Sequence, residues 1–425
     1  MKVLVIGNGG REHALAWKLK QSAGVEEVLV APGNAGTATE PGLRNVDVAV
    51  DDCSGLLDLA RREAVDFTVV GPELPLVAGI VDDFVAAGLA CFGPTKAAAQ
   101  LEGSKAFSKE FLQRHGIPTA AHATFTDVKQ AGDYVRAQGV PIVIKADGLA
   151  AGKGVVVAVD EAQALVAVND MLAGNAFGEA GHKVVIEEFL QGEEASFICL
   201  CDGVHGIPFA SSQDHKARDD GDKGPNTGGM GAYSPAPVVT SEVHAAVMRE
   251  VIEPTLAGMA KDGMPYTGFL YAGLMIDTEG RPKVIEFNCR FGDPEAQPVM
   301  MRLQSDLLHA CQAAVAGTLA DVQLQFDPRV ALGVVMAAGG YPGQYEGGDV
   351  ITGLDKNLAD TKVFHAGTRE EQADIVTAGG RVLCVVGLGE DVALAQARAY
   401  ERLDLIGWRN RYFRKDIGYR AIDRH

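Results

Sequence analysis

The sequence has no excess of positive charge. It contains 38 lysine and arginine residues against 56 aspartate and glutamate residues in 425, which gives a formal net charge of −18. A chain of this sign repels nucleic acid on average. We therefore expect no nucleic-acid partner. A small anionic metabolite stays possible, because its site needs only a few cations and backbone N–H groups.

Long apolar runs are also missing. The first, at residues 3–6, is too short for a signal peptide, and no apolar stretch approaches the roughly 18–20 residues that span a bilayer. The seven cysteines are scattered and odd in number, so they indicate no disulfide framework. Cys199 and Cys201, two apart in an apolar run, are expected to be buried in a strand. These features predict a cytoplasmic protein with no membrane partner.

Glycine, in contrast, is abundant, with 51 residues gathered largely in short loops after apolar runs. Up to residue 103, short apolar strands alternate with helical patterns, which predicts a doubly wound parallel α/β sheet that binds ligands at its carboxyl edge. The pattern then changes, and the length suggests about three domains. We expect them at residues 1–103, at 104–328 with a flexible lid at about 120–190, and at 329–425, the last a small α/β domain.

Three local predictions concern less regular segments. We expect a strand at residues 46–50, a helix at residues 77–87, and an ordered loop at the Gly- and Asp-rich residues 219–231. No internal repeat or low-complexity stretch is present.

The turn after the first strand, Gly7-x-Gly9-Gly10, invites a dinucleotide-binding interpretation. That fingerprint requires Gly-x-Gly-x-x-Gly and an acidic residue at the end of the second strand. Here Glu12 occupies the third glycine position, and the second strand ends in Ala31-Pro32 without a carboxylate. We therefore reject NAD or FAD. The N–H groups of the turn could still hold one phosphate, and a tight turn without a ligand is the alternative.

Two lysines flank a second glycine-rich loop. Lys145 ends an apolar strand, and Lys153 follows eight residues later between Gly152 and Gly154. Ammonium groups neutralise phosphate oxygens and glycine lets the backbone approach them, so the pattern suits a flexible lid over a triphosphate. It is not a P-loop, which needs Gly-x4-Gly-Lys-Ser/Thr. A solvent-exposed hairpin lysine is the alternative.

The sharpest signal is Glu286-x-Asn288-x-Arg290. Residues two apart in a strand share a face, so the carboxylate, the amide and the guanidinium are expected to point into one site. A carboxylate and an amide oxygen suit Mg²⁺, which keeps waters and substrate phosphates as its other ligands. Arg290 could then grip a phosphate or a carboxylate with two hydrogen bonds. A structural ion-pair network is the alternative.

Two weaker segments also carry polar groups. Backbone groups of residues 187–190 could recognise adenine, and a carboxylate a few residues on could accept ribose hydroxyls. Asp214-His215-Lys216 precedes the donor-rich residues 225–231, which suit an anion or a substrate rim. A lone histidine such as His215 is more often structural than catalytic. No Ser/His/Asp or Cys/His set is evident for nucleophilic catalysis.

Taken in order, these motifs make the chain similar to the ATP-grasp enzymes, and within them to the phosphoribosylamine–glycine ligase (glycinamide ribonucleotide synthetase) family. The resemblance covers essentially the whole chain. It rests on the ordered set GNGGREH at 7–13, GPELPL at 71–76, KADGLAAGKG at 145–154, GPNTGGMG at 224–231, NCRFGDPE at 288–295 and AAGGYP at 337–342.

This resemblance implies a reaction in which ATP, glycine and 5-phosphoribosylamine give glycinamide ribonucleotide, ADP and phosphate through glycyl phosphate, in purine (IMP) biosynthesis. It implies Mg²⁺ or Mn²⁺ as the metal, phosphoribosylamine binding by residues 1–103 and an ATP-grasp domain at 104–328. We expect a monomer. Such phosphoryl transfer depends on positioning and electrostatics rather than on covalent work by side chains.

The resemblance also implies roles for individual residues. In catalysis they are Arg290, Lys145 and Lys153. The implied nucleotide-binding residues are Lys105, Lys145, Gly152, Lys153, Gly154, Glu187, Glu188, Phe189, Leu190 and, for the ribose, Glu194 with Glu193 as second choice. The implied metal ligands are Glu286 and Asn288, and the implied substrate-binding residues are Gly9, Gly10, Glu73, Asp214, Lys216, Arg290, Gly292 and Asp293.

The sequence departs from the wider ATP-grasp pattern at one place. Many members carry a second metal carboxylate on the strand before Glu286, but residues 271–276 contain none and Asp277 lies past their end. Whether Lys216 or Arg218 meets substrate also stays open. The rival interpretations are another ATP-grasp enzyme, such as a biotin-dependent carboxylase subunit or a ligase with a different acceptor, and a non-enzymatic nucleotide-binding module on the same fold.

Overall fold

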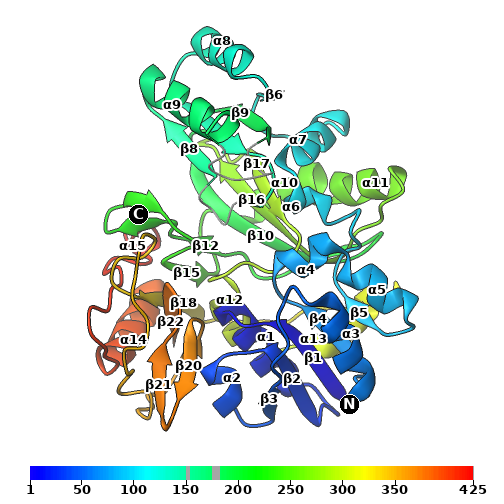
Figure 1. The fold of residues 1–425 in the computed structure, drawn as a ribbon, viewed down its shortest axis with the longest axis vertical. Helices are drawn as coiled ribbons and strands as arrows, with labels where there is room; N and C mark the ends of the chain where they lie inside the picture. Colours follow the sequence, from blue (N-terminus) through cyan, green and yellow to red (C-terminus); the bar gives the residue numbers. More distant parts are fainter. Residues whose placement is uncertain (150–153, 175–181, 425) are drawn as a thin grey trace.

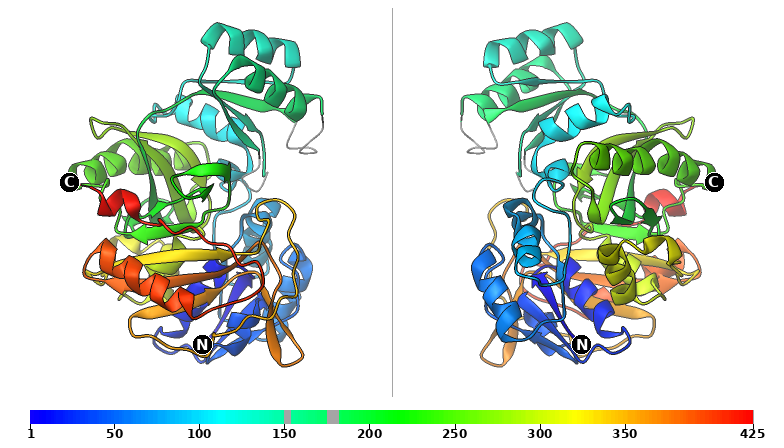
Figure 2. Two further views of the ribbon diagram at one scale, coloured as in Figure 1. Left: turned by 90° about the vertical axis from the view of Figure 1, so that its left-hand side faces the viewer. Right: turned by 90° about the vertical axis from the view of Figure 1, so that its right-hand side faces the viewer.

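A computed structural model describes residues 1–149, 154–174 and 182–424 of the chain. In Figure 1 the N-terminal sheet lies at the lower right and a C-terminal sheet at the lower left, with a longer sheet rising above them. A small sheet with two helices forms the top of the molecule, and Figure 2 shows it projecting away from the rest.

The N-terminal part is a five-stranded parallel sheet in the order β3-β2-β1-β4-β5. Alternate residues of β1 enter two different hydrophobic cores, Leu4 and Ile6 one and Val3 and Val5 the other, as expected for a sheet covered on both faces. The predicted doubly wound α/β fold is confirmed. Its elements are β1 (Lys2–Gly7), α1 (Gly10–Lys20), β2 (Glu27–Pro32), α2 (Ala35–Thr39), β3 (Leu43–Asn45), α3 (Cys53–Arg62), β4 (Phe67–Val70), α4 (Glu73–Ala78), α5 (Ile80–Ala86) and β5 (Cys91–Phe92).

The small sheet at the top is antiparallel, in the order β6-β9-β7-β8. It has a core of its own, in which helix residues such as Val135 and Val168 pack with strand residues such as Ile144 and Ile186. It occupies the interval for which the sequence predicts a lid. Its elements are β6 (His122–Phe125), α8 (Val128–Gln138), β7 (Ile142–Ala146), β8 (Val155–Ala158), α9 (Glu161–Leu172) and β9 (Val184–Glu188).

The central sheet is also antiparallel, in the order β11-β10-β16-β17. Cys199 and Cys201 are fully buried on β10, as predicted. The elements here are α6 (Gln100–Gly103), α7 (Lys105–Arg114), β10 (Glu193–Asp202), β11 (Gly206–Pro208), α10 (Ser241–Val247), a π-helical turn (Met248–Ile252), α11 (Glu253–Lys261), β16 (Thr267–Ile276), β17 (Pro282–Asn288), α12 (Ala296–Arg302), α13 (Leu307–Ala316) and a short 3₁₀ helix (Leu319–Asp321).

The C-terminal sheet, in the order β12-β15-β18-β22-β19, is built from two distant parts of the chain. Its strands β12 (Gln213–Asp214) and β15 (Gly231–Ser234) come about 100 residues before the other three. This pairing fixes Asp214 at a sheet edge. The remaining elements are β13 (Ala217–Asp219), β14 (Lys223–Asn226), β18 (Val330–Ala337), β19 (Thr361–His365), β20 (Thr368–Glu371), β21 (Asp374–Thr377), β22 (Arg381–Gly389), α14 (Val392–Asp404) and α15 (Tyr419–Ile422).

The three local predictions are wrong in detail, each for a physical reason. Residues 46–50 form no strand, because their valines pack on the core after the edge strand β3 has ended. The helix predicted at 77–87 is interrupted at Gly79, whose φ of 104° does not fit an α-helix. Within 219–231, residues of β14 pair with β13 as a hairpin instead of forming only a loop.

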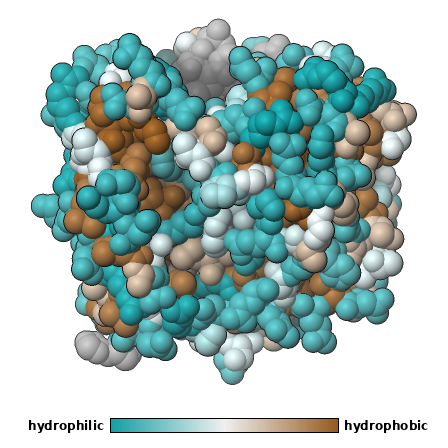
Figure 3. Space-filling view, turned by 90° about the horizontal axis from the view of Figure 1, so that it is seen from below, coloured by the Kyte–Doolittle hydropathy of each residue, from teal (hydrophilic) through white to brown (hydrophobic). Residues whose placement is uncertain are grey.

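The surface carries scattered apolar residues. The face seen from below is mainly hydrophilic, with hydrophobic residues gathered in patches between hydrophilic ones (Figure 3). Patches of this kind are ordinary on protein surfaces. In the described ranges, no helix combines the length and the apolar character needed to cross a membrane.

Candidate active site

The predicted metal ligands lie on β17 and share one of its faces. Glu286 pairs with Gly273 and Asn288 with Tyr271 of β16, while Phe287 between them is buried in the core. In the amide orientation that satisfies both polar atoms, the Asn288 nitrogen donates to Glu102 Oε1 at 3.0 Å. The amide oxygen is then the atom left for a cation.

This donor set fits a divalent cation of the magnesium type. One carboxylate and one amide oxygen leave most of the coordination shell to water and phosphate oxygens, as Mg²⁺ prefers. In the described residues, no group of three or more His, Cys, Asp and Glu side chains could hold a metal by themselves. Asp277 is engaged elsewhere. Its carboxylate accepts a hydrogen bond from the Arg281 N–H and forms a 2.8 Å ion pair with the Arg281 side chain.

Arg290, just past the end of β17, lies between two carboxylates. Its Nε is 3.2 Å from Glu73 Oε2, and its Nη2 is 2.9 Å from Glu102 Oε1. Burial raises the pKa of the Glu102 carboxyl even though the charge of Arg290 opposes it. Burial acts in the same direction on Glu73, but Arg290 and Arg11 bring the pKa of that carboxyl below its ordinary value. The guanidinium is therefore held in a fixed position.

The lysines predicted to contact phosphate come from strand β7 of the small sheet and from helix α7. Lys145 on β7 is buried, with its Nζ 3.0 Å from the Glu187 carboxylate on β9 and 3.2 Å from the Ile285 carbonyl oxygen. Lys109 on α7 lies 2.9 Å from the same carboxylate. Lys105, one turn earlier, donates to the Gly148 carbonyl at 2.8 Å, and burial lowers its pKa.

Two predicted residues of the glycine loop, Gly152 and Lys153, lie outside the described residues. Gly154 is described, and its carbonyl accepts a hydrogen bond from the Ala146 N–H at 2.8 Å. This contact continues the β7–β8 pairing toward the loop, which places both ends of the loop beside Lys145.

The predicted nucleotide segment around the end of β9 divides between the interior and the surface. The Glu187 side chain points inward to the two lysines, whereas Glu188 points outward to Lys283 at 2.9 Å. Phe189 is 40% exposed. Further on, Glu194 lies 2.7 Å from Lys216, while Glu193 lies 3.0 Å from Arg424 near the C-terminus.

A second charged cluster surrounds Asp214. Its Oδ1 is 3.3 Å from Lys216 Nζ, and the same ammonium reaches Glu194. Burial raises the pKa of Asp214 to about 6, against the effect of Lys216, with Glu295 and Glu194 adding to the rise. Arg218 instead pairs with Asp219 at 2.7 Å. The structure therefore places Lys216, and not Arg218, in this cluster.

Uncharged donors extend the cluster toward the turn after β17. The Ser196 hydroxyl donates to Glu295 Oε1 at 2.9 Å and lies 2.9 Å from the Tyr271 hydroxyl oxygen. Glu295 in turn fills the space over Gly292, where an added Cβ would lie 2.3 Å from its Oε2. A side chain at position 292 would therefore displace the Glu295 carboxylate.

The glycine turn after β1 comes together with Asp293. The Arg11 N–H donates to Asp293 Oδ2 at 3.3 Å, and the Arg11 side chain donates to the Phe291 carbonyl oxygen. A Cβ at Gly7 would lie 2.3 Å from Glu12 Cγ, and one at Gly10 would lie 2.4 Å from Gln297 Nε2. Glu12 thus fills the space over the turn.

Arg381 brings the C-terminal sheet into the same region. Its Nη1 donates to the Gly228 carbonyl at 2.6 Å and to the Asp293 carbonyl at 2.7 Å. Sequence reasoning missed it, and also Glu102 and Lys109, because each is a single charged residue in an ordinary strand or helix pattern. Only the fold reveals their partners. The sequence gives one signal for Lys109, which lies one helical turn after Lys105 and is therefore expected on the same face of the helix.

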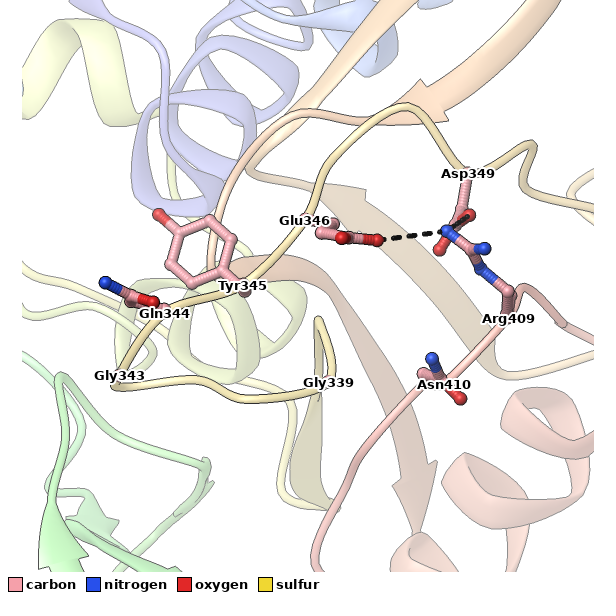
Figure 4. Close-up of a pocket in the computed structure, with 8 residues that line it drawn as sticks. All are labelled: Gly339, Gly343, Gln344, Tyr345, Glu346, Asp349, Arg409 and Asn410. Atoms are coloured by element: carbon pink, nitrogen blue, oxygen red, sulfur yellow. Dashed lines mark hydrogen bonds and ion pairs between the residues drawn. The ribbon is translucent and has the colours of Figure 1, made fainter.

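Two hollows of the surface lie outside the group formed by Lys145, Glu286 and Arg290, and one of them includes Glu193 and Arg424. One, of about 610 Å³, is on the C-terminal part, where Arg409 reaches toward Asp349 and Glu346 (Figure 4). The other, of about 810 Å³, runs beside α10 and the turn at Asp277.

Models of three domains of one family match the chain in order. They are the phosphoribosylglycinamide synthetase N domain at residues 1–102, its ATP-grasp (A) domain at 103–296 and its C domain at 331–420. Among curated relatives, the phosphoribosylamine–glycine ligases of Allochromatium vinosum and Xanthomonas campestris pv. campestris are 64% and 66% identical. Each of these two alignments covers 100% of this chain and 99% of the relative.

Solved structures show the same likeness. The crystal structure of the phosphoribosylamine–glycine ligase from Thermotoga maritima matches with a TM-score of 0.85 at 33% identity, over 98% of this chain and 100% of that one. A biotin carboxylase from Campylobacter jejuni matches with a TM-score of 0.77 over 97% of this chain and 92% of that one. Its 15% identity supports a shared fold alone.

Proposed function

The chain belongs to the phosphoribosylglycinamide synthetase family, and from that membership we propose how its residues divide the work of an ATP-dependent ligase. The reaction joins glycine to 5-phosphoribosylamine with ATP, giving glycinamide ribonucleotide, ADP and phosphate, a step of purine biosynthesis. The observation that carries this conclusion is the identity of 62–66% to phosphoribosylamine–glycine ligases over the full chain. ATP and a divalent metal are the family's cofactors.

The chemistry requires two successive attacks. A glycine carboxylate oxygen attacks the γ-phosphorus, ADP leaves, and glycyl phosphate forms. The amine of phosphoribosylamine then attacks the glycyl carbonyl carbon, phosphate leaves, and the amine loses a proton as the amide forms. Positioning and electrostatic stabilisation supply most of the rate enhancement in reactions of this kind.

On the nucleotide side, we assign the ATP phosphates to Lys105, Lys145 and Lys153, the adenine to residues 187–190 and the ribose to Glu194. Glu286 and the Asn288 oxygen would hold Mg²⁺ or Mn²⁺, which supplies positive charge against the phosphate oxygens during transfer. Arg290 would orient the transferring phosphate or the glycine carboxylate. Its two carboxylate partners support this role, because they keep the guanidinium at one place beside β17.

On the acceptor side, we assign glycine to Asp214 and Lys216. A glycine zwitterion carries one charge of each sign, and this pair presents the complementary charges 3.3 Å apart. Phosphoribosylamine is assigned to the turn at Gly9 and Gly10, together with Glu73, Gly292 and Asp293. The contact of Arg11 with Asp293 supports this grouping. We further propose that the chain acts as a monomer in the cytoplasm, with domain boundaries near residues 103 and 328.

ADP release by the purified protein tests the proposal. The assay contains ATP, Mg²⁺ and glycine, with and without freshly generated 5-phosphoribosylamine. We expect release that requires both substrates. Release driven by bicarbonate and biotin, or by another amino acid in place of glycine, would keep the ATP-grasp chemistry and overturn the substrate. ATP binding without any substrate-dependent release would favour a nucleotide-binding module.

A further inference from the structure

The last residues of the chain lie along the segment that carries Lys216. We call residues 412–424 the C-terminal arm and residues 214–222 the acceptor segment. In Figure 1 the C-terminus and α15 lie next to β12, and both views of Figure 2 show the red end of the chain beside the green strands. The arm is about 200 residues away in sequence, so its contacts with the acceptor segment are created by the fold.

Backbone and side-chain hydrogen bonds follow the acceptor segment almost residue by residue. The Tyr412 hydroxyl donates to Asp219 Oδ1 at 2.8 Å, and the Lys415 N–H donates to Asp220 Oδ1 at 2.8 Å. In the other direction, the Gly221 N–H donates to Asp416 Oδ2 at 2.8 Å. The arm is therefore matched to the shape of this segment.

A buried charge network lies at the centre of these contacts. Arg414 is fully buried and donates to the Ala217 carbonyl at 3.1 Å and to Asp222 Oδ1 at 2.8 Å. Asp222 also accepts from the Tyr419 hydroxyl at 2.6 Å and pairs with Arg420. Burial acts to raise the pKa of Asp222, but these partners and His215 bring it far below its ordinary value, so Asp222 is ionised.

His215 lies between this network and Lys216, the next residue in the chain. The Gly418 N–H donates to His215 Nε2 at 2.9 Å, so that nitrogen carries no proton. Its Nδ1 faces Asp222 at 3.6 Å. Burial lowers the pKa of the imidazole, which is therefore neutral with its proton on Nδ1, the nitrogen on the Asp222 side. The histidine singled out in the sequence is accordingly a structural link and not a base.

The acceptor segment needs such support because its own secondary structure is weak. β13 and β14 form an isolated two-stranded hairpin, and every residue of β14 is exposed. A hairpin of this size is marginally stable by itself in water. Lys216 lies between His215 and Ala217, both held by the arm, and its ammonium points to Asp214 and Glu194.

We propose that the C-terminal arm, acting through Asp222, positions Lys216 for glycine. The inference rests on the substrate-binding role proposed above for Lys216. Asp222 is a positioning residue in this scheme, because it holds Arg414, which in turn donates to the carbonyl of Ala217 next to Lys216. The arm lies apart from Lys109, Lys145 and Glu187 beside the predicted phosphate site, although Lys216 also contacts Glu194 at 2.7 Å. Changes at Asp222 are therefore expected to affect glycine use more than ATP use.

Steady-state kinetics of the full-length protein test this inference. Asp222→Asn removes the charge at the centre of the network, and Tyr419→Phe removes one hydrogen bond to it, a milder change that also serves if Asp222→Asn does not fold. Arg409→Gln is the matched control, because Arg409 stands just before the arm but pairs with Asp349 at 3.2 Å in the pocket of Figure 4. Lys216→Ala is measured in parallel, and melting temperature is recorded for each variant.

We expect kcat/KM for glycine to fall at least tenfold in Asp222→Asn and severalfold in Tyr419→Phe, with KM for ATP within twofold of wild type and Arg409→Gln unchanged. Wild-type glycine kinetics in both variants, beside an inactive Lys216→Ala, would overturn the positioning role while leaving the proposed function intact. Equal losses for glycine and ATP that track the melting temperature would also overturn it. A fully active Lys216→Ala would remove the role of Lys216 itself, and the inference with it.

Discussion

The Glu102 carboxylate lies 2.9 Å from the Arg290 guanidinium. The same carboxylate accepts hydrogen bonds from the Cys289 N–H at 2.7 Å and from the Asn288 amide at 3.0 Å. One buried side chain on α6 therefore holds three consecutive residues at the end of β17. Asn288 is a proposed metal ligand and Arg290 the proposed phosphate or carboxylate contact. Glu102 therefore fixes the positions of these two side chains relative to each other.

Replacing Glu102 by Ala should damage both stability and turnover. The change leaves Arg290 with Glu73 as its remaining carboxylate and removes the acceptor of the Cys289 N–H, and breaking a buried pair costs about 3–5 kcal/mol. Urea unfolding measures the loss of stability. Glu102→Gln keeps an acceptor oxygen, so we expect it to retain most of the stability while shifting the Mg²⁺ dependence of ADP release. Wild-type Mg²⁺ dependence in Glu102→Gln would contradict this role.

Glu102 also shows where sequence reasoning ends. The shared face of Glu286 and Asn288 follows from the two-residue period of a strand, and Lys145 and the glycine turn after β1 follow from their place at strand ends. Such features are local and could be predicted. Glu102 and Cys289 are 187 residues apart, and their contact depends on how α6 packs against β17. The order of the motifs identified the family, but no local pattern indicated the residues that hold the site together.

Changing Glu286 to Gln tests the metal site directly. The variant keeps the shape and one acceptor oxygen but removes the negative charge that a divalent cation requires, so turnover should fall by roughly a hundredfold or more. Glu286 is only partly buried on the edge strand β17, so the melting temperature should change little. ADP release and thermal unfolding of the same preparation provide the two measurements. Activity near that of wild type would remove Glu286 from the metal site.

Arg381 should couple the C-terminal sheet to Asp293, which we assign to phosphoribosylamine. Its guanidinium holds the carbonyl oxygens of Gly228 and Asp293, so Arg381→Met releases both segments. We expect kcat/KM for 5-phosphoribosylamine to fall about tenfold, the equivalent of about 1.4 kcal/mol. Arg369→Gln is the control, because Arg369 pairs with Glu371 and both side chains are exposed. Equal kinetics for the two variants would exclude the coupling.

Stability should decrease on acidification because of a buried histidine pair between the N-terminal and C-terminal sheets. Burial lowers the pKa of His365 to about 3 from 6.5, and it lowers that of His13 as well. Because the pKa is lower in the folded state, the neutral histidine contributes its full stabilisation above about pH 6.5. This stabilisation is lost as the pH falls toward the pKa of the folded state. At pH 5 the loss from His365 is about 2 kcal/mol. Urea unfolding at pH 7.5 and 5.0 should show a smaller loss in His365→Asn than in wild type.

Asp214 should give the opposite dependence. Burial raises its pKa from 3.8 to about 6, so the group stabilises the fold fully when protonated, below about pH 3.8, and this contribution disappears as the pH rises through 6. The ionised carboxylate at pH 7.5 therefore stabilises the fold less than the protonated form does at low pH, and Asp214→Asn should lack this pH dependence of stability.

Activity should follow the same titration with the reverse preference. The ionised form of Asp214 is the one that offers a negative charge to the glycine ammonium, so kcat/KM for glycine in wild type should fall about tenfold per pH unit below 6. Asp214→Asn should be slow at all pH values and should lack this acidic limb. An acidic limb that persists in Asp214→Asn would assign the titration to another group.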